Sequence, residues 1–162
     1  MKAAILMGSK NDYPVVERAE GVLKAFGVGY ETRIISAHRT PSVAEAFSKG
    51  AEAEGIEVII AAAGKAAHLA GVIAANTPLP IIGLPIKSST LDGLDSLLSV
   101  VQMPKGIPVA TVAIDGAENA ALLAVQIMSG KHPELREAMR KYKQDMEQEI
   151  ILADKEFQEG KE

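Results

Sequence analysis

Residues 30–47 read Tyr30-Glu31-Thr32-Arg33-Ile34-Ile35-Ser36-Ala37-His38-Arg39-Thr40-Pro41-Ser42-Val43-Ala44-Glu45-Ala46-Phe47, and this stretch decides the fold. Its first six residues are rich in β-branched and aromatic side chains, which predicts a strand. A helix is predicted to begin at Pro41, with Thr40 as its N-cap. His38 and Arg39 therefore lie where a strand ends and a helix begins. Ligands bind at such strand ends in open α/β sheets.

His38 and Arg39 are the residues of this turn that carry chemistry. An imidazole gains and loses a proton near neutral pH. A guanidinium is planar and binds a phosphate through two parallel donors. The pair indicates acid–base chemistry on an anionic small molecule. The alternative for His38, taken alone, is a structural role as a histidine that bonds to a loop carbonyl.

The rest of the chain repeats the alternation of strand and helix. Five such units with short connections predict a parallel five-stranded sheet with helices on both faces. We favour a flavodoxin-like three-layer α/β/α sandwich, because five units are too few for an eight-stranded barrel. In the helix over 91–101, Leu94, Leu97, Leu98 and Val101 are expected to face inward. The predicted strands are 3–7, 30–35, 56–63, 81–84 and 109–114, and the predicted helices are 13–26, 41–54, 69–75, 91–101 and 117–128.

The last part of the chain, residues 131–162, differs from the catalytic domain predicted over 1–130. It is strongly charged, yet apolar residues recur in steps of three and four, which predicts a long amphipathic helix projecting from the domain. We expect it to pack on a neighbouring subunit, the alternative being a helix folded back on its own domain. His132 is expected at the surface. The apolar positions are Leu135, Met139, Tyr142, Met146, Ile150, Ala153 and Phe157.

Composition excludes several classes of function. The chain has 162 residues, a net charge of −4, 4% aromatic residues and no cysteine. Negative charge and scarce aromatics argue against a nucleic-acid partner, and the lack of cysteine excludes thiol chemistry. No membrane span or signal peptide is recognisable, so we expect a cytoplasmic protein without a membrane partner.

Three turns should meet at the carboxyl edge of the sheet: Gly8–Asp12, Ser36–Arg39 and Gly64–Gly71. Asp12 is a candidate acceptor for sugar hydroxyls, or else the cap of the helix that follows it. His68 is a second candidate, or else a helix-start residue bonded to the backbone. Lys65 either adds positive charge to the crevice or is simply solvated. Two histidines without a carboxylate cluster do not predict a metal site, and the dinucleotide, phosphate-loop and hydrolase motifs are absent.

The motifs, taken together and in order, resemble the N5-carboxyaminoimidazole ribonucleotide mutases. The resemblance covers about residues 3–128 and implies an enzyme of purine biosynthesis. Such enzymes move a carboxylate from the exocyclic nitrogen to C4 of an aminoimidazole ribonucleotide, as homo-octamers without a metal or cofactor. The matching stretches are Gly8-Ser9-Lys10-Asn11-Asp12, Ser36-Ala37-His38-Arg39-Thr40-Pro41, Ala63-Gly64-Lys65-Ala66-Ala67-His68-Leu69-Ala70-Gly71, residues 95–104, residues 106–111 and residues 119–124.

The resemblance also implies a role for each candidate residue. His38 would move the proton between nitrogen and carbon. Ser9 and Arg39 would bind the 5′-phosphate and Asp12 the ribose hydroxyls. Asn11, which stands where the mutases usually have serine, would donate a further hydrogen bond to the substrate. The residues expected around the carboxylate and the carbon dioxide are Ser36, Gly64, His68 and Leu69.

Besides Asn11, three positions depart from the mutase pattern: Ala62, Lys65 and Ala70 replace Gly, Gly and Pro. Lys65 matters most, since it adds a side chain where carbon dioxide should be held. A related class, the aminoimidazole ribonucleotide carboxylases, has a basic residue at this place and uses carbon dioxide directly. That class usually has Lys in place of Arg39 and lacks the histidine found here as His68. The carboxylase is therefore the alternative function, and a non-catalytic nucleotide-binding module is another. A phosphoacceptor receiver would need an acidic cluster at the end of the first strand, which Asp12 alone does not form.

Overall fold

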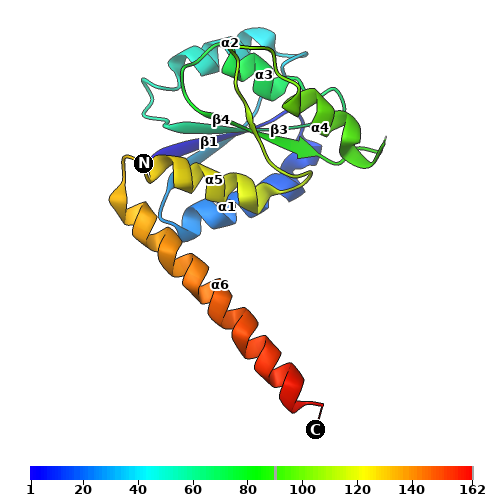
Figure 1. Ribbon diagram of the computed structural model, residues 1–162. Helices are drawn as coiled ribbons and strands as arrows, with labels where there is room; N and C mark the ends of the chain where they lie inside the picture. Colours follow the sequence, from blue (N-terminus) through cyan, green and yellow to red (C-terminus); the bar gives the residue numbers. More distant parts are fainter. Residues whose placement is uncertain (90, 162) are drawn as a thin grey trace.

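The computed structural model describes residues 1–89 and 91–161. Its centre is a sheet of five parallel strands in the order β2-β1-β3-β4-β5 (Figure 1). The predicted flavodoxin-like α/β fold is confirmed. β1 lies between β2 and β3, so that Ala3 pairs with Tyr30 on one side and with Val58 on the other. The strands are β1 (Lys2–Met7), β2 (Gly29–Ile34), β3 (Val58–Gly64), β4 (Ile81–Ile86) and β5 (Ala110–Thr111).

Helices cover both faces of the sheet, as Figure 1 shows. α1 and α5 lie on one face, and α2, α3 and α4 lie on the other. Among the described residues, no helix has an apolar run long enough to cross a membrane. The helices are η1 (Lys10–Asp12), α1 (Tyr13–Ala25), α2 (Pro41–Gly50), α3 (Leu69–Ala74), η2 (Leu91–Gly93), α4 (Leu94–Val101), α5 (Ala117–Met128) and α6 (Pro133–Glu159).

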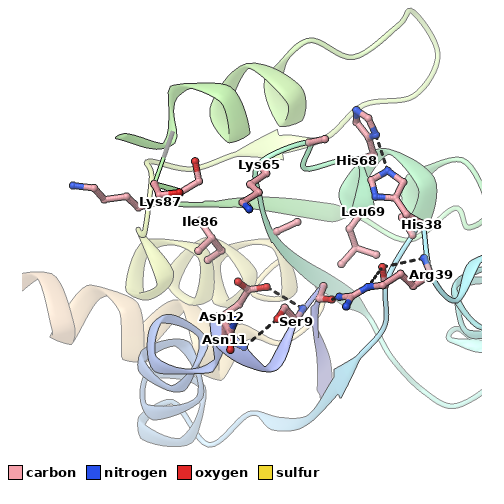
Figure 2. A pocket seen from close by; sticks show the side chains of 18 residues that line it. Ser9, Asn11, Asp12, His38, Arg39, Lys65, His68, Leu69, Ile86 and Lys87 are labelled. Carbon is pink, nitrogen blue, oxygen red and sulfur yellow. Dashed lines mark hydrogen bonds between the residues drawn. The ribbon is translucent and has the colours of Figure 1, made fainter. Parts of the chain in front are cut away.

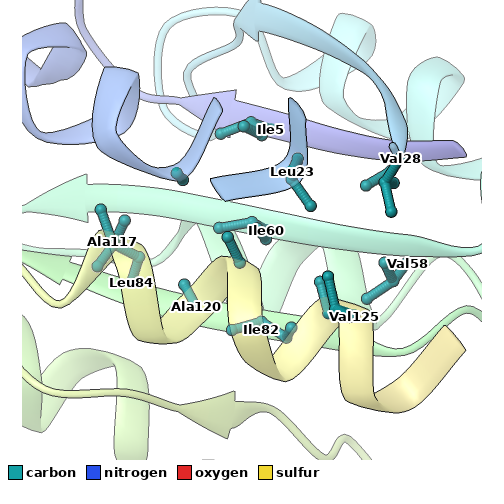
Figure 3. Packing of buried hydrophobic residues seen from close by; sticks show 14 of the residues in the cluster. Ile5, Leu23, Val28, Val58, Ile60, Ile82, Leu84, Ala117, Ala120 and Val125 are labelled. Atoms are coloured by element: carbon teal, nitrogen blue, oxygen red, sulfur yellow. The ribbon is translucent and has the colours of Figure 1, made fainter. Parts of the chain in front are cut away.

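Successive side chains of the central strands point to opposite faces of the sheet, so they form two separate hydrophobic cores. Ile5, Ile60 and Ile82 point toward α1 and α5 and are fully buried (Figure 3). α5 faces them with alanines such as Ala120, which let the helix lie close to the sheet. Each large apolar side chain buried in this way stabilises the fold by about 1.5–3 kcal/mol. The rigid sheet that results fixes the positions of the turns at its carboxyl edge.

α4 does not present the face that its sequence predicts. Leu94, Leu98 and Val101 are 46%, 48% and 47% exposed, whereas the buried side chains of this helix are Ser96 and Val100. The expected inward face was therefore wrong for these three residues. The reason lies in β4, where a Cβ on Gly83 would come within 2.2 Å of Val100 Cγ1. The helix lies so close to the strand that only small side chains fit between them.

The remaining boundaries shift by a few residues. β4 continues to Ile86, two residues beyond the predicted end, and so reaches the edge where the turns meet. β5 is only Ala110–Thr111, because the chain leaves the regular ladder soon after its pairing with β4. α2 ends at Gly50 rather than near Glu54, and residues 51–55 form turns.

α6 contacts the domain only near its start. Leu135 and Met139 are buried, and the Tyr142 ring lies 5.6 Å from that of Phe26. Beyond these turns the helix projects away from the sandwich (Figure 1).

The base of α6 is fixed by Glu57, which precedes β3. His132 Nε2 lies 2.8 Å from a carboxylate oxygen of Glu57, and its side chain is only 18% exposed. The prediction of a surface histidine was therefore wrong. Lys131 Nζ and the amino group of Met1 pair with the same carboxylate, at 3.4 and 3.6 Å. Although burial alone would raise the pKa of Glu57, the hydrogen bond from His132 and the charges of His132 and Lys131 hold it below the usual glutamate value.

Candidate active site

A cavity of about 670 Å³ opens at the carboxyl edge of the sheet, where the turns after β1, β2, β3 and β4 meet (Figure 2). All nine candidate residues lie on its wall, so the structure brings together turns that are far apart in the sequence. Its lining residues are Gly8, Ser9, Asn11, Asp12, Ser36, Ala37, His38, Arg39, Ala63, Gly64, Lys65, Ala66, His68, Leu69, Ile86, Lys87, Ser88 and Ser89.

The turn after β1 is closed by two side-chain hydrogen bonds. The Asn11 N–H donates to Ser9 Oγ at 3.2 Å, and the Ser9 N–H donates to Asp12 Oδ2 at 3.1 Å. Asp12 stands at the N-cap position of α1 but makes no capping hydrogen bond there. Its carboxyl is buried, which raises its pKa, while the Ser9 N–H and the charge of Arg39 act in the opposite direction. Asp12 is thus held inside the cavity wall.

Arg39 joins the turn after β2 to the turn after β1. Its Nη2 donates to the Gly8 carbonyl at 2.7 Å, and its Nε donates to Ser36 Oγ at 3.4 Å. Ser36 is held in turn by Thr40, whose Oγ1 accepts from the Ser36 N–H at 3.0 Å. Thr40 occupies the predicted N-cap position, but its hydroxyl bonds to the loop rather than to the helix. The guanidinium is therefore fixed in place with donors left for an anion.

His38 and His68 contact each other across the cavity rim. His38 Nε2 lies 2.9 Å from His68 Nδ1, and the two rings are nearly perpendicular, at 85°. One ring nitrogen must donate a proton and the other must accept it, so the pair holds a proton that can be transferred. His68 stands at the start of α3, yet its side chain makes no capping bond there. The alternative considered for His68, a hydrogen bond to the backbone at the start of a helix, is therefore not observed, and the side chain contacts the His38 ring instead.

The turn after β3 forms the opposite wall. A Cβ on Gly64 would lie 3.3 Å from the carbonyl oxygen of Ile86, so glycine lets the ends of β3 and β4 approach closely. Leu69 is buried and gives this wall an apolar surface. Lys65 has a positive φ of 56°, and Figure 2 shows its side chain pointing into the cavity.

The turn after β4 also lines the cavity, through Ile86, Lys87, Ser88 and Ser89, and sequence reasoning missed it. Lys87 Nζ pairs with Asp92 at 3.3 Å, and its backbone N–H donates to Asp115 Oδ1 at 2.8 Å. The sequence offered one signal for this turn, namely its position after a strand, because the carboxyl ends of all parallel strands lie at the same edge of the sheet.

Comparison with known proteins agrees with this geometry. The model of the family described as AIR carboxylase matches residues 2–149. The chain belongs to the AIR carboxylase family. This family membership confirms the resemblance that the sequence motifs indicate.

Similar members of the family share most of their length with the chain. An N5-carboxyaminoimidazole ribonucleotide mutase of Pyrococcus abyssi is 61% identical over 145 residues, which are 90% of this chain and 83% of that protein. A protein of the same name from Saccharolobus solfataricus is 55% identical over 150 residues, which are 93% of this chain and 95% of that protein. A crystal structure of Treponema denticola PurE superimposes with a TM-score of 0.88 at 33% identity, covering 96% and 97% of the two chains.

Proposed function

We propose that this protein is an N5-carboxyaminoimidazole ribonucleotide mutase of de novo purine biosynthesis, which leads to IMP. It is an isomerase that moves the carboxylate of its substrate from the exocyclic nitrogen to C4 and gives 4-carboxy-5-aminoimidazole ribonucleotide. The single observation that carries the proposal is the 2.9 Å contact of His38 with His68 in the cavity that also contains Arg39 and Asp12. The names of the relatives at 61% and 55% identity support the same reaction.

The cavity wall offers a partner for each part of the ribonucleotide. Arg39 and the Ser9 hydroxyl bind the 5′-phosphate, because a fixed guanidinium fork matches two phosphate oxygens. The Asp12 carboxylate accepts hydrogen bonds from the ribose hydroxyls, and Asn11 donates to the substrate from the same turn. This arrangement leaves the imidazole ring near His38, with Ser36, Gly64, His68 and Leu69 around the group that moves.

His38 carries out both proton transfers. Its imidazolium donates a proton to the exocyclic nitrogen while the bond from that nitrogen to the carboxylate carbon breaks, which releases carbon dioxide. Ring carbon C4 then attacks the carbon dioxide, and the neutral imidazole removes the proton from C4. The proton returns to His38 and the cycle needs no other co-reactant. General acid–base catalysis of this kind contributes about 10²- to 10⁴-fold to a rate.

The test of this proposal is the variant His38→Asn. We expect its turnover of N5-carboxyaminoimidazole ribonucleotide to fall by at least about 10²-fold, while its affinity for the product changes little. His132→Asn is the matched control, since it removes an imidazole that lies outside the cavity, and its turnover should persist. Substantial turnover by His38→Asn would remove His38 from this role. Binding without turnover by the unmodified protein would indicate a non-catalytic nucleotide-binding module.

The direct carboxylase is the second candidate, because Lys65 places positive charge in the cavity. The two functions are separated by substrate. The mutase converts N5-carboxyaminoimidazole ribonucleotide at low bicarbonate, whereas the carboxylase converts aminoimidazole ribonucleotide at high bicarbonate. Much faster turnover in the second assay would replace the mutase proposal.

We also propose that the chain acts as a cytoplasmic homo-octamer, with residues 131–162 packed on a neighbouring subunit. Large apolar side chains beyond Tyr142 support this, for Ile150 and Phe157 are 70% and 61% exposed. The exposed leucines of α4 supply a second apolar surface of the kind that subunit interfaces cover.

Truncation after Lys143 tests the assembly, because it leaves Leu135, Met139 and Tyr142 against the domain. We expect sedimentation to give an octamer for the full chain and smaller species for the truncated chain. An octamer that survives this truncation would contradict the packing proposed for the tail.

A further inference from the structure

Lys65 adopts a backbone conformation that a lysine rarely takes. Its φ of 56° lies in the left-handed region, which costs a non-glycine residue about 1–3 kcal/mol. Glycine would remove this cost. Such strain in the wall of a cavity raises the question of what the side chain does there.

The positive charges of the cavity are not equally available. The Arg39 guanidinium bonds to the Gly8 carbonyl and the Ser36 hydroxyl, and the Lys87 ammonium pairs with Asp92. For Lys65, by contrast, no ion pair or side-chain hydrogen bond is found among residues 1–89 and 91–161. Figure 2 shows its amino group within the cavity, on a different wall from Arg39. Lys65 is thus a cation that has no counter-ion among the described residues and that faces the space for a ligand.

We propose that the Lys65 ammonium binds the carboxylate that the reaction moves, both before and after its transfer. This inference rests on the proposed function. The ribonucleotide carries two anionic groups, a phosphate and a carboxylate, and the cavity offers a fixed fork for one and a mobile ammonium for the other. A phosphate suits the planar fork of Arg39. A carboxylate that changes its point of attachment suits a point charge on a flexible four-carbon stem, which can follow it.

The charge of Lys65 then has a specific effect on the kinetics. Carbon dioxide, the intermediate, is neutral, whereas substrate and product both carry the carboxylate. The ammonium therefore stabilises the bound substrate and the bound product more than it stabilises the intermediate state that contains carbon dioxide. Interactions of this kind lower KM without raising kcat. Lys65 is accordingly a specificity-determining residue that favours carboxylated over uncarboxylated ribonucleotides.

The experiment compares two ligands on three variants by isothermal titration calorimetry. The ligands are 4-carboxy-5-aminoimidazole ribonucleotide and 5-aminoimidazole ribonucleotide, which differ only in the carboxylate. Lys65→Met keeps most of the stem and removes the charge, and Lys65→Gly also removes the backbone strain. Lys10→Met is the matched control, because Lys10 lies in the neighbouring turn but outside the lining of the cavity.

We expect both Lys65 variants to bind the carboxylated ligand about 10- to 150-fold more weakly, the effect of one lost charged hydrogen bond. Their affinity for the uncarboxylated ligand should change less than twofold, and KM should rise while kcat does not fall. Lys65→Gly should unfold at no lower temperature than the unmodified protein, so it remains informative if Lys65→Met folds poorly. Lys10→Met should bind both ligands normally.

Two results would overturn the inference: unchanged affinity for the carboxylated ligand, or an equal loss for both ligands, which would indicate a merely structural role. If the unmodified protein binds neither ribonucleotide, the proposed function fails and the inference fails with it. If it binds and converts the substrate but the Lys65 variants do not discriminate, the proposed function stands and the inference alone is refuted.

Discussion

Replacing Arg39 with lysine should weaken the binding of the ribonucleotide selectively at its phosphate. The guanidinium already uses Nη2 for the Gly8 carbonyl, at 2.7 Å, and Nε for the Ser36 hydroxyl, at 3.4 Å. Its remaining donors stay available for phosphate oxygens. Lysine has a single nitrogen at the end of its chain, so it cannot bridge the two turns and also present a fork.

The size of the effect follows from the number of bonds lost. Arg39→Lys keeps the positive charge but gives up at least one charged hydrogen bond to the phosphate, worth about 1.5–3 kcal/mol. This corresponds to a loss of affinity of about 10- to 150-fold. The contacts proposed for the ribose and the base do not involve Arg39, so the dephosphorylated nucleoside should bind to the variant as it binds to the unmodified protein.

The assay is calorimetric titration of 5-aminoimidazole ribonucleotide and of its nucleoside. Arg33→Lys is the control. Arg33 belongs to the edge strand β2, its guanidinium lies over the Phe47 ring of α2, and it does not line the cavity. Undiminished affinity of Arg39→Lys for the ribonucleotide would mean that the phosphate is held elsewhere. An equal loss for the nucleoside would mean that Arg39 acts only by holding the turns together.

Two further predictions concern stability, measured by urea unfolding. Glu57→Gln should lower the free energy of unfolding at pH 7 by about 1–2 kcal/mol, because His132, Lys131 and the amino group of Met1 lose the partly buried carboxylate with which they pair. The folded pKa of Glu57 lies below its unfolded value near 4.5, so its stabilisation is present above that pH and is lost as the pH falls through the folded pKa. The variant and the original should therefore become equally stable in strong acid, and a difference that persists there would contradict the ion-pair explanation. Gly83→Ala should cost about 1–3 kcal/mol, since the new Cβ would lie 2.2 Å from Val100 Cγ1 and 2.9 Å from Val109 Cγ1. The double variant Gly83→Ala, Val100→Ala should recover part of that loss, and an unchanged midpoint for the single variant would disprove the close approach of α4.

Local patterns predicted the alternation of strands and helices because each pattern depends on few neighbours. The run Ala3–Met7 is apolar throughout and can only be a buried segment, and Pro41 marks the start of a helix. Parallel topology then places the turns after the strands at one edge. This is why residues as distant as Ser9 and His68 were expected in one crevice, and both line the cavity.

What the sequence could not predict depends on contacts between distant residues. The apolar stripe of α4 indicated a buried face, but the inward position is decided by the absence of a side chain at Gly83 on another strand. The fourth strand was predicted to end at Leu84, yet β4 continues through Pro85 and brings Ile86 to the cavity. The 2.9 Å contact of His38 with His68 joins positions thirty residues apart, and no local pattern encodes it.

The order of the strands also bears on how the chain is made. β1 lies inside the sheet, although it precedes both of its neighbours, β2 and β3, in the chain. Its partners β2 and β3 are complete only after residues 34 and 64 have been synthesised. At about 5–20 residues per second, the nascent apolar segment waits several seconds for its second neighbour. Ala3–Met7, which is buried in the folded protein, therefore stays exposed during this interval of synthesis.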